Sequence, residues 1–261
     1  MILSSQTLRG IPLPVRAAAA AEAGFISIGA HHEDLARAPI DGVRDAVEAA
    51  GVNVVEVGFL HRWAGPEHAA REEREALFDM AGSLGAARVN AGLFAGPDRA
   101  RIVDCFRTLC MTAEAVGLRV SLEFFPFGAI ADALAAWEVI ERAGQPNADL
   151  LFDAWHWHRG GADIAMLSAV RPGAIRFLQL SDAATAVSPD VGEESRHGRL
   201  LPGSGAIDLT GLLRGLNAAG HHPSIAVEVL SDELAAMDPR RAASLAASST
   251  RQVLESASWL D

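Results

Sequence analysis

The sequence predicts a (β/α)8 barrel that forms a single domain over residues 1–261. Short apolar runs alternate with Ala-rich amphipathic stretches along the whole chain, and eight such units can be counted with no linker or low-complexity segment between them. The length of 261 residues fits one barrel, because α/β barrels of about 250 residues are common. A doubly wound open sheet would give the same alternation, so it remains the alternative.

Each unit starts with a short run of apolar or β-branched residues, which is typical of a buried parallel strand. The predicted strands are 2–5, 26–29, 53–57, 87–91, 119–124, 149–153, 175–180 and 224–228. Apolar residues at helical spacing follow each strand. The predicted helices are 12–23, 40–50, 67–84, 98–117, 129–143, 162–170, 207–219 and 239–258.

Glycines mark several of the predicted helix ends, where a left-handed residue closes a helix before the next strand. They are Gly24, Gly51, Gly85, Gly117, Gly144 and Gly220. Asp208 is suited to cap the helix that follows it. The stretch 183–206 is the one long irregular connection, and loops of this length in compact domains are usually functional.

The composition excludes several kinds of chemistry. The chain contains neither Lys nor Tyr, so all 22 basic residues are Arg and a lysine Schiff base or a P-loop lysine is excluded. The net charge of −11 makes nucleic acid and anionic membranes poor partners. No G-x-G-x-x-G follows the first strand and no Walker motif is present, so no nucleotide cofactor is expected.

Neither a leader peptide nor a membrane span is predicted. The first nine residues lack a basic start followed by an apolar stretch, and no run approaches the roughly 18 apolar residues that cross a bilayer. We therefore expect a cytoplasmic protein whose partner is a small-molecule substrate.

Polar residues stand at the ends of four successive predicted strands. They are Glu123, Asp153, Gln179 and Glu228. In a barrel these ends meet at the rim that carries the active site. Three converging carboxylates repel one another unless a cation neutralises them, so we predict a divalent metal site, and the all-oxygen ligand set favours Mn²⁺ or Mg²⁺. For any one of the four, a capped strand end or an ion pair with Arg is the alternative.

These residues, in this order and spacing, carry a resemblance to a known family. Glu123, the D-x-x-H element of Asp153 and His156, the Q-L-S-D element at 179–182, the stretch R-L-L-P-G-S-G-A-I-D at 199–208 and Glu228 stand in sequence. Together they resemble the sugar phosphate isomerase/epimerase superfamily, the xylose-isomerase-like TIM barrels. The resemblance covers essentially the whole chain and is most specific between 119 and 228.

The resemblance implies a role for each matching residue. Glu123, Asp153, Gln179 and Glu228 would bind one divalent metal, and His156 and Arg199 would contact substrate oxygens. In the family's isomerases and epimerases the metal stabilises an enediolate formed from a hydroxy-ketone, while two glutamates act as acid and base, here Glu123 and Glu228. Homodimers are common among members. The departure is Gln179, because most members have His at this position.

Several other functions are compatible with parts of this pattern. Some 3-dehydroshikimate dehydratases of the family carry Gln at the position of Gln179, which makes a metal-dependent lyase of the dehydroshikimate or inosose type the second hypothesis; others have a His where this chain has Phe125. Phosphodiester cleavage, as in endonuclease IV, is disfavoured by the acidic charge. A non-catalytic barrel subunit is the alternative from a different class.

Further residues near the predicted rim are candidates for substrate contact. His61 follows the third strand, and Trp155 lies beside His156. We predict both as substrate contacts, with a solvated histidine and simple rim packing as the respective alternatives. Glu56 and Asn90 lie near the ends of strands three and four, and each is expected either in the barrel mouth or in the packed layers, because strand alternation cannot be phased over so few residues.

Overall fold

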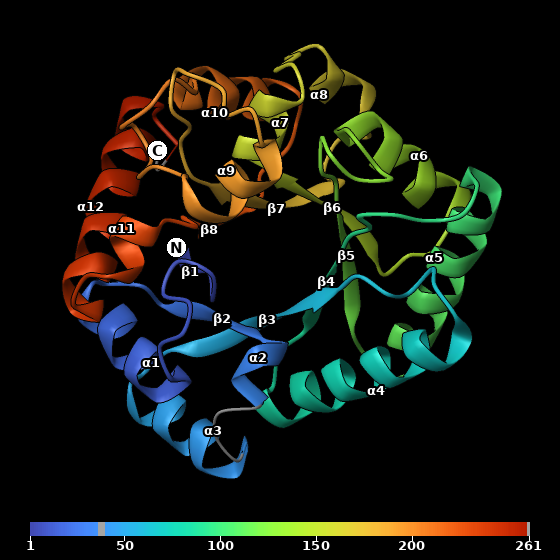
Figure 1. Ribbon diagram of the computed structural model, residues 1–261, viewed down its shortest axis with the longest axis horizontal. Coiled ribbons are helices and arrows are strands. Elements are labelled where there is room, and N and C mark those ends of the chain that lie inside the picture. The colour runs from blue at the N-terminus through green and yellow to red at the C-terminus, as the bar shows by residue number, and fades with distance from the viewer. Residues whose placement is uncertain (36–39, 260–261) are drawn as a thin grey trace.

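The computed structural model describes residues 1–35 and 40–259 and confirms the predicted (β/α)8 barrel (Figure 1). Eight parallel strands pair in chain order, and β8 closes the barrel against β1. The strands are β1 (Ile2–Leu3), β2 (Ser27–His31), β3 (Asn53–Leu60), β4 (Arg88–Ala91), β5 (Arg119–Glu123), β6 (Ala148–Asp153), β7 (Ile175–Leu180) and β8 (Ser224–Val227).

Helices form a ring around the strands (Figure 1). The long ones are α1 (Leu13–Glu22), α3 (Ile40–Ala49), α4 (Glu67–Leu84), α5 (Arg99–Glu114), α6 (Ala133–Ala143), α10 (Leu209–Ala218) and α12 (Pro239–Ser256). The short ones are α2 (His32–Leu35), α7 (Ala154–Arg159), α8 (Met166–Ala169), α9 (Val191–His197) and α11 (Asp232–Ala235). Among the described residues, no helix is long and apolar enough to span a membrane.

The barrel interior fixes which side chains point inward. Ile2, Leu151, Phe177 and Ala226 pack together as a cluster inside the barrel. Successive residues of a strand face opposite sides, so residues two positions further on face the same side. Asp153, Gln179 and Glu228 therefore also point inward, one level nearer the C-terminal ends of their strands.

An ionic cluster lies toward the N-terminal end of the barrel. The buried Asp149 accepts hydrogen bonds from Arg88 at 2.8 Å and from Arg119 at 2.9 Å, and Ser121 also donates to it. These contacts balance the charge of Asp149 and leave the opposite end of the barrel as the place for chemistry.

The observed elements depart from the prediction in several places, of which three lie near the site. The predicted helix 162–170 contains only the four-residue α8. The stretch 183–206, expected to be irregular, contains α9. The unpredicted helix α7 starts directly after β6, because the side chain of Asp153 accepts a hydrogen bond from the backbone N–H of His156 and so caps the helix.

Candidate active site

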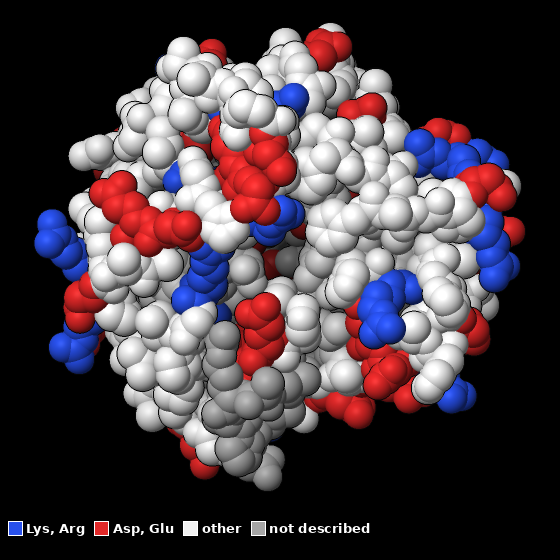
Figure 2. All heavy atoms as spheres, in the orientation of Figure 1, with Lys and Arg blue, Asp and Glu red and all other residues white. Residues whose placement is uncertain are grey.

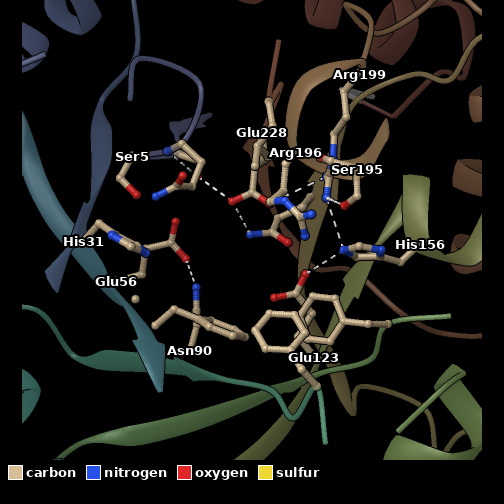
Figure 3. A pocket seen from close by; sticks show the side chains of 18 of the residues that line it. Ser5, His31, Glu56, Asn90, Glu123, His156, Ser195, Arg196, Arg199 and Glu228 are labelled. Carbon is tan, nitrogen blue, oxygen red and sulfur yellow. Dashed lines mark hydrogen bonds and ion pairs between the residues drawn. The ribbon is translucent and has the colours of Figure 1, made fainter. Parts of the chain in front are cut away.

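A cavity opens at the C-terminal ends of the strands. In the space-filling view it is the hollow near the centre of the molecule (Figure 2). The residues that line it come from the ends of most strands and from α9, and they include Glu123, Gln179 and Glu228 (Figure 3). This is the end of the barrel at which the sequence places the candidate site residues.

Glu228 is held in place by two hydrogen bonds to its Oε1 atom. The hydroxyl of Ser4 donates to it at 2.7 Å, and the amide Nε2 of Gln179 donates at 2.8 Å. The other end of the Gln179 amide, Oε1, is buried and has no hydrogen-bond partner among the described residues. Burying an amide oxygen without a hydrogen-bond partner costs free energy, and a ligand bound to this oxygen would recover that cost.

The D-x-x-H spacing serves both α7 and the cavity. Asp153 uses Oδ1 to cap α7 at 2.9 Å from the backbone nitrogen of His156, and this places the His156 imidazole over the cavity. Its second oxygen, Oδ2, accepts from Arg199 Nη1 at 2.7 Å. Asp153 itself is fully buried and does not line the cavity.

Arg199 joins these acidic groups. Its guanidinium donates to Asp153, lies 3.7 Å from Glu228 Oε2, and is anchored by the backbone carbonyl of Ser195 at 2.9 Å. Its Nη2 lies 3.1 Å from His156 Nε2. Because Arg can only donate, Nε2 of His156 must accept, which makes His156 a neutral imidazole with its proton on Nδ1.

The pKa values of the site follow from burial and mutual repulsion. Burial lowers the pKa of His156 to about 3, in agreement with a neutral ring. Burial, with further repulsion from Glu228 and Asp153, raises the pKa of Glu123 well above its usual value. Burial also raises the pKa of Glu228 to about 7, although Arg199 opposes this rise. Burial alone would also raise the pKa of Asp153, but the contact with Arg199 outweighs burial, so this pKa is lowered.

The residues present fit a divalent cation. One guanidinium faces three carboxylates, so the site carries excess negative charge that raised pKa values relieve only in part. One oxygen or nitrogen atom each of Glu123, Asp153 and His156 lies within 4.8 Å of the others, which is close enough to surround one ion. The unpartnered oxygen of Gln179 is a further candidate ligand, of the hard, neutral type.

A wall of phenylalanines bounds the cavity beside these polar groups. Phe59, Phe94, Phe125 and Phe127 line it, and the ring of Phe125 meets that of His156 edge-on at 4.7 Å. Gly92 makes room for this wall, since a Cβ atom there would lie 2.3 Å from the Phe125 ring. Such a wall excludes water and offers a flat apolar surface to a ring.

Trp155 and His61 lie elsewhere than predicted. Trp155 is fully buried, and its indole packs under the Arg199 guanidinium at 5.2 Å, so it supports Arg199 and is not among the residues that line the cavity. His61 also does not line the cavity; its Nδ1 lies 2.9 Å from Glu73 Oε1. Neither position supports direct contact with a substrate in the cavity.

Glu56 and Asn90 both belong to the cavity, a point that the sequence left open. Asn90 Nδ2 donates to Glu56 Oε2, and both side chains are buried in the wall. The register between β2 and β3 shifts here: Ile28 pairs with Val54 and Gly29 with Glu56, so Val55 has no partner. A bulge of this kind breaks the alternation of side chains and turns Glu56 into the barrel mouth.

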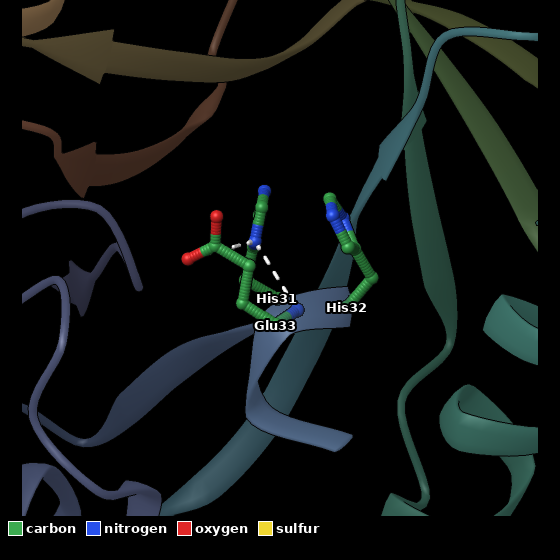
Figure 4. Close-up of side chains that lie close together, drawn as sticks. All are labelled: His31, His32 and Glu33. Carbon is green, nitrogen blue, oxygen red and sulfur yellow. Dashed lines mark hydrogen bonds and ion pairs between the residues drawn. The ribbon is translucent and has the colours of Figure 1, made fainter. Parts of the chain in front are cut away.

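A second group of ligand-type side chains lies at the rim (Figure 4). Atoms of His31, His32 and Glu33 lie within 4.8 Å of one another, and the two imidazole rings are 4.2 Å apart. His31 also lines the cavity. This group is therefore part of the cavity mouth at the end of β2.

The connection after β7 is organised by Asp182. This fully buried carboxylate accepts hydrogen bonds from four backbone N–H groups of the following connection at 2.9–3.0 Å, those of Ala183, Gly203, Gly205 and Ile207. The backbone of Asp182 also pairs with that of Leu200, next to Arg199. Asp182 therefore positions the segment that carries Arg199.

The raised pKa of Glu56 predicts a pH-dependent stability. Burial raises this pKa from 4.5 to about 7, despite the hydrogen bond from Asn90. A carboxyl that binds its proton more tightly when folded stabilises the protein fully below pH about 4.5 and loses this contribution as pH rises through about 7. Over this pH range we expect the wild type to lose up to about 3 kcal/mol of folding stability that the Glu56→Gln variant does not lose.

Urea unfolding at about pH 5 and about pH 7.5 measures this difference. The wild type should lose more free energy of unfolding between the two values than the variant does. Glu228 and Glu123 titrate in both proteins, and the charge of Glu56 contributes to their raised pKa values, so the difference between the two proteins includes this coupling as well as the titration of Glu56 itself. An identical pH dependence for both proteins would contradict the buried, protonated state of Glu56.

The fold and the site together define a (β/α)8 barrel with an acidic cavity at the end where enzymes of this fold carry their active sites. The similarity to known protein families agrees with this class and also identifies the family. The chain belongs to the xylose isomerase-like TIM barrel family, whose model matches residues 17–261. The resemblance to the sugar phosphate isomerase/epimerase superfamily is thereby confirmed.

Curated relatives have names of two kinds. The chain is 32% identical over 174 residues to a 3-dehydroshikimate dehydratase of Pseudomonas aeruginosa, which covers 65% of this chain and 27% of that protein. It is 29% identical over 154 residues to an inosose isomerase of Halalkalibacterium halodurans, and the match covers 58% of this chain and 54% of that protein. The matched regions thus span about a quarter and about half of these relatives.

Solved structures share the fold over nearly the whole chain. A xylose isomerase-like TIM barrel/4-hydroxyphenylpyruvate dioxygenase fusion protein superposes with a TM-score of 0.89 at 25% identity, covering 98% of this chain and 42% of that one. The IolI protein with a bound zinc atom superposes with a TM-score of 0.86 at 20% identity, covering 97% of each chain. At this identity the likeness to IolI bears on the fold alone.

Proposed function

We propose that the protein is a divalent-metal-dependent isomerase or epimerase that acts on a ketose, cyclitol or related hydroxy-ketone. The observation that carries this proposal is the pair of buried glutamates, Glu123 and Glu228, which reach one cavity from different strands with raised pKa values. A carboxyl group whose pKa lies near the working pH can both take and return a proton. The inosose isomerases among the relatives support this reading.

Four residues would hold the ion, as the sequence predicts: Glu123, Asp153, Gln179 and Glu228. In the structure, ligand atoms of Glu123 and Asp153 also lie within 4.8 Å of His156, which the proposal assigns to the substrate. When bound, a divalent ion supplies positive charge that stabilises the negative oxygens of an enediolate. The oxygen ligands favour Mn²⁺ or Mg²⁺. The unpartnered Oε1 of Gln179 is the structural reason to include this residue, because the amide already donates to Glu228 and so turns its oxygen away from it.

The remaining residues bind and orient the substrate. Glu123 takes or returns the proton on one face of the reacting carbon and Glu228 does so on the other, because they enter the cavity from β5 and from the end of β8. His156 and Arg199 hold substrate oxygens. The phenylalanine wall keeps water from the reacting carbon.

A metal-dependent dehydratase is the second candidate. The similarity to two 3-dehydroshikimate dehydratases favours it, and so does Gln179 at the position where most members have His. In this reaction a glutamate removes the proton beside the carbonyl and a β-hydroxyl leaves as water, so the product gains a double bond. The same cavity residues would serve, since the first proton transfer is common to both reactions.

The experiment that tests the proposal is turnover in deuterated water with Mn²⁺ on ketoses, inosose and 3-dehydroshikimate. We expect deuterium to enter the substrate or its isomer at the carbon beside the carbonyl, as followed by NMR. Water loss with a new conjugated chromophore would instead identify the dehydratase. No exchange and no product with any compound, together with failure to bind Mn²⁺ or Mg²⁺, would favour a non-catalytic barrel subunit.

A further inference from the structure

Glu56 and Asn90 form a polar corner of the cavity that the proposed reaction does not use. Figure 3 shows them across the cavity from His156, on the side of β3 and β4. Asn90 Nδ2 donates to Glu56 Oε2, while Asn90 Oδ1 is buried without a hydrogen-bond partner among the described residues. The corner thus holds a buried acceptor that a ligand could satisfy.

The backbone around this corner is shaped to admit Glu56. The β3 bulge turns its side chain inward, and Gly29 on the neighbouring strand leaves space for the carboxyl group. A Cβ atom at position 29 would lie 2.7 Å from Glu56 Oε1 and 3.2 Å from its Cγ. Two independent backbone features, the β3 bulge and the absence of a side chain at Gly29, therefore allow Glu56 to face the cavity.

The chemistry of the corner selects the group that binds there. A ligand must supply a donor to satisfy Asn90 Oδ1, and it must tolerate an acidic side chain beside it. An alcohol hydroxyl does both, because it donates and accepts hydrogen bonds and carries no charge. A phosphate or carboxylate offers only acceptors when ionised and would be repelled by an ionised Glu56.

We propose that Glu56 and Asn90 bind a hydroxyl group of a neutral polyhydroxylated ring, on the side of the ring away from Arg199 and His156. This assignment rests on the proposed function and narrows its substrate class to cyclitol-like or sugar-like ketones. The phenylalanine wall that runs between the two polar regions suits the face of such a ring. Glu56 is then a substrate-binding residue and lies outside the metal ligands.

Calorimetric titration with the unreactive polyol myo-inositol, on Mn²⁺-loaded protein, tests the contact without turnover. We expect Glu56→Ala and Asn90→Ala to weaken binding at least about tenfold, and Glu56→Gln to weaken it less, because an amide still offers a donor and an acceptor. Glu75→Gln makes the same chemical change on the exposed face of α4 and should bind as the wild type does.

Two results overturn the proposal. The first is the absence of myo-inositol binding by the wild type, or equal binding by the wild type and Glu56→Ala. The second is a loss of Mn²⁺ affinity in Glu56→Gln, a near-isosteric variant, because Glu56 would then belong to the metal site. Exchange in deuterated water reports separately on the proposed function: exchange without Glu56-dependent binding refutes only the contact, and Glu56-dependent binding without exchange refutes only the reaction.

Discussion

Glu228→Gln is expected to lower kcat by about 10²–10⁴-fold on whichever hydroxy-ketone the wild type converts, which is the range for loss of a general acid–base group. The amide cannot take up a proton, yet it is nearly isosteric with the carboxylate. Its oxygen can still accept the hydrogen bond from Ser4 that holds the side chain. The fold should therefore survive, and the loss should lie in chemistry.

Steady-state kinetics with saturating Mn²⁺ measures this loss, and a parallel Mn²⁺ titration separates weaker ion binding from lost proton transfer. Glu75→Gln serves as the matched control, because it makes the same change outside the cavity. Turnover within a few-fold of the wild type would rule out Glu228 as one of the two acid–base residues.

Asp182→Ala is expected to cost more stability than any other single change considered. Four backbone N–H groups would lose their shared acceptor. Those of Ala183 and Ile207 are buried and cost about 1–3 kcal/mol each when unsatisfied, whereas those of the exposed Gly203 and Gly205 cost less because water can reach them, so the total loss should exceed about 2 kcal/mol. Asp182→Asn keeps one acceptor oxygen and should lose roughly half as much. The connection carrying Arg199 should loosen in both variants.

Urea unfolding gives the two free energies, and limited proteolysis reports whether cleavage concentrates in the stretch 183–208. Ser204→Ala is a suitable control in the same connection, since the side-chain hydroxyl of this exposed residue makes no hydrogen bond to the described part of the chain. A loss below about 1 kcal/mol for Asp182→Ala would mean that water replaces the carboxylate at little cost.

The barrel and the group of polar residues at its C-terminal rim were predictable from the sequence, because the number of strands and the residues at the strand ends determine them. Four polar residues lie within one residue of the end of an apolar strand, and a closed parallel barrel brings all such ends to one rim. They are Glu123, Asp153, Gln179 and Glu228. Their inward orientation follows from two-residue alternation once one inward residue is known. Phe177, for example, fixes the direction of Gln179.

Other features of the site depend on contacts that a linear pattern does not contain. Glu56 faces the cavity only because the register shifts at Val55, and no composition signal marks a bulge. Trp155 was expected near a substrate, but its ring packs under the Arg199 guanidinium and does not line the cavity. Asp182 belongs to the Q-L-S-D element, but its four donors come from residues up to 25 positions away, and no linear pattern identifies them.

Asp153 has a consequence for the precision of the site. Both of its oxygens are engaged, one by the first turn of α7 and one by Arg199, so its rotamer is fixed as soon as the barrel folds. A carboxylate tied in this way has little freedom left to lose when a ligand arrives. The three-residue spacing that starts a short helix therefore also fixes this carboxylate before a ligand binds, and substitutions that disturb the first turn of α7 should make its position less well defined.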